Sequence, residues 1–285
     1  MKINFTKMHG LGNDFILIDC RHLNLDALSE LSKKLCDRRF GIGADQMLLL
    51  SESNRADFRM RIFNADGSEA EMCGNGIRCL AKYIWERNLS RKRTLHIETL
   101  AGIIKPEMVG DMIKVDMGEP IFDPEKIPVN IPLTKGRHEG GKYAQGRIVD
   151  YPLKIADKIF SITCVSMGNP HAIIVVEDLS HFPVQYYGPI IENHPIFPKR
   201  TNIEFIEILN KAEIRIRVWE RGAGETMACG TGASAAAVAS TVKGLTEKSV
   251  KVHLFRGDLL IYWAEDNHVY MTGPTVKVFD GTIEN

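Results

Sequence analysis

The sequence lacks the features that mark several common functional classes. Its charge is balanced, with 36 lysines and arginines against 36 aspartates and glutamates, which gives no electrostatic footprint for nucleic acid or an anionic membrane. Its longest apolar runs are far below the roughly 20 residues of a membrane-spanning helix, and the first ten residues lack the apolar stretch of a signal peptide. We therefore expect a cytoplasmic protein with a small-molecule partner, and neither a nucleic-acid nor a membrane partner.

Metal and redox motifs are missing too. The six cysteines form no C-x-x-C pair, and the nine histidines show neither H-x-x-x-H nor H-x-H spacing, so neither a zinc site nor a thioredoxin-like centre is indicated. The P-loop pattern G-x-x-x-x-G-K-[ST] is absent. Cys20, Cys36 and Cys164 lie in apolar surroundings, as buried thiols do. We expect no metal ion and no cofactor.

What the sequence does contain is an internal repeat. "EMCGNGIRC" (71–79) and "MACGTGASA" (227–235) each set a cysteine against a Gly-polar-Gly turn at the head of an apolar run. The offset of 156 residues that takes Cys73 to Cys229 also pairs other polar residues beside apolar runs: Asn13 with Asn169, Gln46 with Asn202, and Asn64 with Glu220. Two copies of one unit, roughly 3–118 and 160–274, explain this register.

The repeat predicts two domains, 1–118 and 119–274, joined by the Gly-rich stretch 135–147, with the tail 275–285 returning to the first. Segments 57–63 and 213–219 alternate apolar and charged residues as antiparallel strands do, and leucine spacing predicts a helix within 25–39. A helix follows each repeated cysteine. The first has one apolar face, and the second, 232–242, is small and uncharged all round, so we expect it to be enclosed and to end at Gly244.

A cysteine at a helix start suits acid/base chemistry. The helix N-terminus presents unpaired N–H groups and positive potential, which favour a thiolate or a bound anion. Lowering a thiol pKa by about 1.5 units needs roughly 2 kcal/mol, whereas one helix dipole typically supplies about 0.3 to 1 kcal/mol. If a pseudo-twofold axis sets the helix starts across a cleft, the two thiols can exchange protons on opposite faces of one carbon, as stereoinversion requires.

Other interpretations remain open at this point. Cysteines at helix starts are often inert, and Cys73 and Cys229 could form a disulfide under oxidation. A thiol redox sensor would use that bond reversibly. A non-catalytic anion- or nucleotide-binding module would use only the two glycine-rich helix starts. Asn13 and Asn169 could be turn residues after glycine, and His171 could be structural.

The sequence closely resembles the diaminopimelate epimerase family. "NADGSEAEMCGNGIR" and "ERGAGETMACGTGAS" match the segments around that family's two catalytic cysteines, and "HGLGNDF", "GIGADQ", "SMGNPH" and "TNIEF" are similar to its other blocks. The resemblance implies an α+β fold of two pseudo-symmetric halves, each a mostly antiparallel barrel or roll around a central helix, with the active site in the cleft between them. It also implies cofactor-independent epimerisation of LL- to meso-2,6-diaminopimelate, for lysine and peptidoglycan precursors, by a homodimer.

The resemblance assigns roles to residues by position. Cys73 and Cys229 are the acid/base pair, and His171 and Glu220 assist the thiols. Gly74, Asn75, Gly230 and Thr231 hold the reacting carboxylate, while Arg221 suits the distal one. The remaining substrate-binding positions are Asn13, Gln46, Asn64, Asn169, Asn202 and again Glu220. Proline racemase-like enzymes carry different residues around their cysteines, and phenazine-pathway isomerases replace the thiols.

Overall fold

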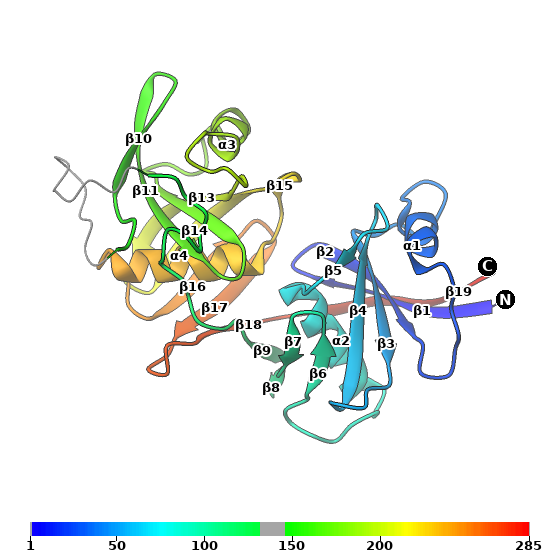
Figure 1. Cartoon of the computed structure of the whole chain (residues 1–285). Helices are drawn as coiled ribbons and strands as arrows, with labels where there is room; N and C mark the ends of the chain where they lie inside the picture. Colours follow the sequence, from blue (N-terminus) through cyan, green and yellow to red (C-terminus); the bar gives the residue numbers. More distant parts are fainter. Residues whose placement is uncertain (1, 132–145, 285) are drawn as a thin grey trace. The chain divides into compact units, whose positions relative to one another are not determined.

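The chain folds into two compact units, which a computed structural model describes over residues 2–131 and 146–284 (Figure 1). Unit 1 comprises Met1–Asp116 and Thr272–Asn285, and unit 2 comprises Met117–Met271. The boundaries expected from the repeat lie two or three residues away from these. Most of the Gly-rich connection 135–147 falls outside the described residues.

Unit 1 carries one eight-stranded sheet with two helices. Its elements are β1 (Lys2–Gly10), β2 (Asn13–Asp19), α1 (Leu28–Cys36), β3 (Gln46–Ser51), β4 (Phe58–Asn64), β5 (Glu69–Ala70), α2 (Gly74–Glu86), β6 (Ile97–Thr99), β7 (Gly102–Ile104), β8 (Glu107–Val109), β9 (Met112–Asp116) and β19 (Val276–Glu284). The strand order of the eight-stranded sheet is β19-β1-β2-β3-β4-β6-β7, with β5 paired to β4, and β8 and β9 pair with each other outside this sheet. The strand nearest the C-terminus thus lies at the outer side of β1.

The central strands of unit 1 are buried on both faces, which explains their continuous apolar runs "FILI" and "MLLL". On one face, Leu31 and Leu35 of α1 share a core with alternate residues of β2 and β3. On the other face, the start of α2 at Gly76 approaches Phe15 and Leu48. The apolar face expected for α2 is confirmed, because Ile77, Leu80, Ala81 and Ile84 are fully buried there.

Unit 2 is a larger sheet with its own helix pair. Its elements are β10 (Tyr151–Ile155), β11 (Lys158–Ser166), β12 (Pro170–Val175), α3 (Val184–Glu192), β13 (Asn202–Asn210), β14 (Glu213–Glu220), β15 (Gly224–Thr226), α4 (Gly230–Val242), β16 (Ser249–Leu254), β17 (Gly257–Trp263) and β18 (Val269–Gly273), which crosses the unit boundary. The strand order is β10-β11-β12-β13-β14-β16-β17-β18, with β15 paired to β14.

Helix α4 runs through the middle of unit 2. It contacts β11, β12, β13, β14, β16 and β17, and nearly all of its alanine, serine and glycine residues are buried. Small side chains let the strands approach the helix from several directions, as expected from the uncharged run. The chain leaves the helix after Lys243, where Gly244 takes a left-handed φ of 70°.

The 156-residue offset extends to the register of the strands. Helices α2 and α4 are each 13 residues long and begin at Gly74 and Gly230. The parallel pair β2–β3 aligns Phe15 with Gln46, and the parallel pair β12–β13 aligns His171 with Asn202. Each unit therefore positions the start of its cysteine-capped helix over an equivalent part of its sheet.

Two helices differ from the expectations. The helix expected within 25–39 covers only Leu28–Cys36, because Ala27 has a left-handed φ of 48° and Asp37 is extended. Helix α3 is not predicted by the sequence, since "GPIIE" carries a glycine and a proline that usually break helices. Gly188 is needed there because a Cβ would come within 2.5 Å of the Trp219 ring.

Candidate active site

Each unit gathers its polar site residues at one edge of its sheet. Parallel strands β2 and β3 begin at this edge, and β4, antiparallel to β3, ends there. In unit 2 the equivalent strands β12, β13 and β14 repeat the arrangement. The positions predicted from the sequence fall at or next to these strand ends: Asn13, Gln46 and Asn64 in unit 1, and Asn169, Asn202 and Glu220 in unit 2.

Cys73 caps the N-terminus of α2. Its backbone is extended, with φ of −140°, and its sulfur accepts the N–H of Gly76 at 3.4 Å. The N–H groups of Gly74 and Asn75 belong to the first turn, where a helix has no intrahelical acceptors to offer. Donors of this kind, together with the helix dipole, suit an anionic group.

Asn13 links this helix start to the sheet. Its side-chain oxygen accepts from Nδ2 of Asn75 at 3.2 Å and faces the Cys73 sulfur, which donates to it at 3.7 Å. Its own Nδ2 donates to Asp45 at 2.8 Å. Because both ends of the amide are engaged, the orientation of Asn13 is fixed, with an acceptor turned toward the thiol.

Arg78 and Asp45 are members of this cluster to which the sequence interpretation assigned no role. The fully buried Arg78 guanidinium donates to the Gly74 carbonyl at 3.0 Å and to Oδ1 of Asn75 at 2.8 Å, so it fixes the Asn75 amide. Burial lowers the pKa of Arg78. The arginine stands in the quoted motif "GNGIR", five residues after the cysteine, which is the signal that could have indicated it.

Gln46 and Asn64 form a separate pair in unit 1. They are opposite each other across β3 and β4, and Nε2 of Gln46 donates to Oδ1 of Asn64 at 2.7 Å. Nδ2 of Asn64 donates to the Ser68 hydroxyl at 2.9 Å. These contacts hold the two amides at the edge where α2 begins, in the positions expected for a polar substrate end.

Cys229 caps α4 in the same manner as Cys73 caps α2. Its sulfur accepts the N–H of Gly232 at 3.4 Å and lies 3.4 Å from the Thr231 hydroxyl. Cys229 is more enclosed, with only 6% of its surface exposed. Burial, then Glu220 and Glu204, raise the pKa of its thiol well above the usual value, while hydrogen bonds from Thr231 and Gly232 oppose the rise.

His171 and Asn169 connect to Cys229 through Thr231. Nε2 of His171 lies 3.0 Å from Oδ1 of Asn169, whose Nδ2 donates to the Thr231 hydroxyl at 3.3 Å. The other ring nitrogen, Nδ1, lies 2.7 Å from Glu204, and both side chains are fully buried. Glu204 was missed by the sequence interpretation. Its signal is an acidic residue inside the otherwise apolar strand "NIEFI".

Asn202, Glu220 and Arg221 occupy the remaining part of this edge. Asn202 donates to the Pro170 carbonyl at 2.8 Å and accepts the N–H of Arg221 at 2.9 Å. The Arg221 guanidinium is exposed and donates to the Lys199 carbonyl at 3.1 Å. Glu220 accepts a short hydrogen bond from the Thr226 hydroxyl. Arg221 is thus joined to the cluster through its backbone, and its exposed guanidinium is held by the Lys199 carbonyl.

All six cysteines are present as free thiols. Within residues 2–131 and 146–284, no three potential metal-ligating side chains gather in one place. Over the same ranges, none of the helices has the length and apolar character needed to cross a bilayer.

Comparison with known structures identifies the fold. A PhzF-family phenazine biosynthesis protein of Enterococcus faecalis superposes with a TM-score of 0.72 at 13% identity, each chain being covered over 100% of its length. A probable proline racemase of Agrobacterium radiobacter superposes with a TM-score of 0.68 at 14% identity, over 99% of this chain and 93% of the other. The expected fold of two similar sheet-rich halves is thereby confirmed.

Comparison of sequences is more specific. The chain is 51% identical to diaminopimelate epimerase of Acetivibrio thermocellus over 288 residues, 99% of each chain. It is 53% identical to that of Halothermothrix orenii over 291 residues, covering 99% of this chain and 98% of the relative. The family model described as diaminopimelate epimerase matches residues 5–122 and 163–278. The chain therefore belongs to the diaminopimelate epimerase family.

Proposed function

We propose that the protein interconverts LL- and meso-2,6-diaminopimelate without a cofactor, with Cys73 and Cys229 as the acid/base pair. The observation that carries the proposal is the duplicated helix start, in which each cysteine caps a 13-residue helix and accepts an N–H at 3.4 Å. Membership of the epimerase family supports this substrate and its place in lysine and peptidoglycan precursor synthesis.

The reaction needs one base and one acid. One cysteine, as thiolate, removes the proton from the α-carbon, and the electron pair left behind spreads onto the adjoining carboxylate. The other cysteine, as thiol, delivers its proton to the opposite face of that carbon, so the configuration inverts and the two sulfurs exchange protonation states. The proposal therefore requires both sulfurs to reach one α-carbon when substrate is bound.

The helix starts stabilise the charge that develops on the carboxylate. In the proposed complex, first-turn N–H groups of Gly74, Asn75, Gly230 and Thr231 donate to its oxygens. Fixed donors aimed at developing charge usually supply the largest catalytic contribution. Asn13, Asn75 and Arg78 are already bonded to one another, so this part of the site needs little rearrangement to bind an anion.

The distal end of diaminopimelate carries a second amino acid group, and we assign it to the polar strand ends. Arg221 suits its carboxylate, because a guanidinium can bind both oxygens of a carboxylate at once. Asn202 braces the Arg221 backbone. Gln46, Asn64, Asn169 and Glu220 offer amide and carboxylate groups for the remaining donors and acceptors. His171 and Glu220 would also adjust the proton affinity of Cys229.

We also propose a cytoplasmic homodimer. A mechanism that uses two free thiols needs a reducing compartment, which supports the location. The dimer is supported by β19, which pairs with β1 on one side only and exposes Val276, Val278 and Phe279 by 47%, 54% and 47%. Exposed apolar side chains on an edge strand are suited to pairing with a second chain.

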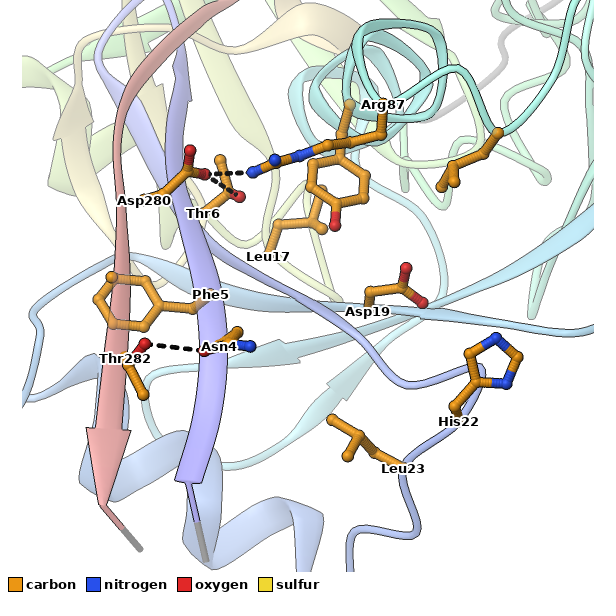
Figure 2. A pocket seen from close by; sticks show the side chains of 13 residues that line it. Asn4, Phe5, Thr6, Leu17, Asp19, His22, Leu23, Arg87, Asp280 and Thr282 are labelled. Atoms are coloured by element: carbon orange, nitrogen blue, oxygen red, sulfur yellow. Dashed lines mark hydrogen bonds and ion pairs between the residues drawn. The ribbon is translucent and has the colours of Figure 1, made fainter.

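A hollow of about 710 Å³ lies beside this edge and adds to the surface available to a partner. Figure 2 shows Asp280 bonded to Thr6 and Arg87, and Thr282 bonded to Asn4. The contacts with Thr6 and Asn4 hold β19 against β1, and the contact with Arg87 joins β19 to the end of α2. A second copy would cover both the apolar edge and this hollow.

The proposed function is tested with the reduced protein and LL-diaminopimelate in deuterated water. Wild type should form the meso isomer with deuterium at the α-carbon, and Cys73→Ala and Cys229→Ala should each reduce turnover by about 10²- to 10⁴-fold, which is the usual contribution of an acid/base group. Cys79→Ala, which removes a buried thiol of the same helix, is the matched control and should remain active.

Turnover retained in either catalytic-cysteine variant would contradict the two-thiol mechanism. A redox role for the same thiols predicts a Cys73–Cys229 disulfide that forms reversibly near the cytosolic potential while the protein does other work. Measuring that potential and assaying epimerisation in reductant separates the two, since activity that rises in reductant supports catalysis by free thiols.

A further inference from the structure

Glu204 is a fully buried carboxyl group in the middle of β13. It lies 2.7 Å from Nδ1 of His171, and neither side chain has any exposed surface. Its second oxygen, Oε2, has no hydrogen-bond partner within the part of the chain that the structure describes. An enclosed carboxyl held by a single histidine is costly, so its contact with His171 calls for an explanation at the site.

The hydrogen bonds beyond His171 lead to Cys229. The ring Nε2 faces Oδ1 of Asn169 at 3.0 Å, so Nε2 must carry the proton of that bond. The Asn169 amide then turns Nδ2 to the Thr231 hydroxyl at 3.3 Å. Because the Thr231 hydroxyl accepts this hydrogen bond from Asn169, it can donate its own hydrogen to the Cys229 sulfur, which lies 3.4 Å away. Every donor in this series of hydrogen bonds is directed toward the Cys229 sulfur.

Unit 1 offers an internal comparison, because the 156-residue offset places Phe15 at the position of His171 and Leu48 at that of Glu204. Both units bring the second of these side chains, Leu48 or Glu204, under the helix start. A Cβ on Gly76 would meet Leu48 at 3.2 Å, and a Cβ on Gly232 would meet Glu204 at 2.8 Å. Unit 2 therefore has a histidine and a carboxyl group where unit 1 has a phenylalanine and a leucine, at equivalent positions of the backbone.

The direction of the hydrogen bonds differs between the units accordingly. In unit 1, with no histidine beside it, Asn13 turns its oxygen to the helix and accepts from Asn75 and from the Cys73 sulfur. In unit 2, Asn169 turns its oxygen to His171 and its Nδ2 to the helix. The Cys73 thiol thus donates to Asn13, whereas the Cys229 sulfur is the last acceptor in a series of hydrogen bonds that begins at His171.

We propose that Glu204 is a positioning residue for Cys229: by engaging Nδ1 of His171 it keeps a proton on Nε2, and so directs the Asn169 and Thr231 donors toward the sulfur. The inference rests on the proposed function for its catalytic meaning, since a donated hydrogen bond stabilises a thiolate acting as base. It explains the position of Glu204 without requiring contact with substrate.

The proposal holds for either location of the shared proton. A neutral Glu204 donates O–H to Nδ1, which leaves the ring proton on Nε2, and an ionised Glu204 pairs with an imidazolium that carries protons on both nitrogens. Burial, with Glu220 adding to it, raises the pKa of the Glu204 carboxyl, while His171 lowers it. The groups facing Glu204 are His171 on β12, Cys164 on β11, Glu220 on β14 and Cys229 at the start of α4.

Two substitutions separate this role from plain packing. Glu204→Gln keeps an N–H that can donate to Nδ1, whereas Glu204→Leu introduces the residue type found at the equivalent position of unit 1 and leaves Nδ1 unengaged. Glu192→Gln is the matched control, because Glu192 is another buried carboxylate of unit 2, bonded instead to Trp219 and Gly222.

The first measurement is nitrogen-15 NMR of the His171 ring, which reports the tautomer directly. Wild type, Glu204→Gln and Glu192→Gln should all show a protonated Nε2, and Glu204→Leu should show a mixture of tautomers. A wild-type ring with the proton on Nδ1 and a bare Nε2 overturns the proposal, even if no variant folds.

The second measurement is the rate of Cys229 alkylation against pH, followed by peptide mass spectrometry in a Cys73→Ser background. Glu204→Leu should slow the reaction by about fivefold, as the loss of one net hydrogen bond implies, and Glu204→Gln should restore it. Faster alkylation of Glu204→Leu would show that the carboxylate acts only as an opposing charge, and would overturn the proposal. Neither measurement needs turnover, so failure of the epimerase assay is a separate outcome.

Discussion

At the scale of single residues, the support of Asn13, a proposed substrate-binding residue, depends on a compact set of charges. Asp14 follows Asn13 and accepts from Lys7 at 2.7 Å and from Arg38 at 2.7 and 3.0 Å. Arg38 also bonds Asp45, the acceptor of the Asn13 amide. Burial opposes ionisation of Asp14, but the hydrogen bonds from Arg38 and Lys7 outweigh it and hold the pKa at about 2.

This network predicts a specific acid sensitivity. Because the folded pKa of Asp14 is below its unfolded value of 3.8, its stabilisation is complete above about pH 5 and is lost as the pH falls through about 2. We expect Asp14→Asn to lower the free energy of unfolding at neutral pH by about 1 to 2 kcal/mol, after allowing for solvent screening. Urea unfolding at a series of pH values measures this difference.

The difference between wild type and Asp14→Asn should shrink steadily in acid. Asp111→Asn, at an exposed turn, is the control and should follow the wild-type curve throughout. A gap between Asp14→Asn and wild type that stays constant from neutral pH to pH 2 would show that the loss comes from packing and not from charge.

Single residues were predictable where a motif marks them. Cys73, Cys229 and the polar strand ends stand at repeated positions, and the structure places them at equivalent sheet edges. Glu204 and Asp14 could not be assigned roles, because their importance comes from burial and from partners distant in sequence, such as His171 and Arg38. The acidic residue inside the apolar run "NIEFI" marks Glu204 as unusual, but it does not indicate which residue Glu204 contacts.

At the scale of elements, the two capped helices begin against different surroundings. A Cβ added to Gly76 on α2 would lie 3.2 Å from the methyl carbon Cδ2 of Leu48. A Cβ added to Gly232 on α4 would lie 2.8 Å from the Glu204 carboxyl and 3.3 Å from the Cys229 sulfur. A flexible methyl group can move by a few tenths of an ångström. A buried carboxyl held by a histidine has much less freedom.

We therefore expect Gly232→Ala to be more damaging than Gly76→Ala. Overpacking typically costs about 1 to 3 kcal/mol, and in Gly76→Ala the better helix propensity of alanine, up to about 1 kcal/mol, should offset most of it. Thermal unfolding of both variants makes the comparison. Equal midpoints, or a lower midpoint for Gly76→Ala, would contradict the tight approach of α4 to Glu204.

Elements were predictable to the extent that their periodicity is regular. Helices α2 and α4 and the alternating strands β4 and β14 follow from apolar spacing and the repeat. Helix α3 was missed because its stability comes from packing of Tyr187 and Ile191 on the core of unit 2, which compensates for Gly188 and Pro189. Helix α1 starts later than predicted because Ala27 has a left-handed backbone conformation. An alanine in the sequence gives no indication of that conformation.

At the scale of the whole molecule, the proposed dimer gives β19 a second role beyond closing unit 1. We expect Val278→Lys, on the most exposed apolar position of this strand, to convert the dimer to a monomer in light-scattering measurements at micromolar concentration. A desolvated lysine without a partner charge should weaken association by more than 10-fold, since each 1.4 kcal/mol changes affinity about 10-fold.

The control is Ile159→Lys, which changes an apolar side chain that is 71% exposed on β11 of unit 2. This variant should keep the oligomeric state of the wild type. A monomeric wild type, or dissociation caused equally by Ile159→Lys, would remove β19 as the interface.

The return of the C-terminal strand has a consequence for synthesis on the ribosome. Strand β1 is made long before its neighbour β19, which spans residues 276–284. Unit 2, Met117–Met271, is encoded between them. During translation unit 2 can therefore fold as a unit while β1 still has one unpaired side. Strand β1 thus waits for its neighbour until unit 2 has been made, and a chain lacking residues 276–284 would have an open, aggregation-prone sheet edge.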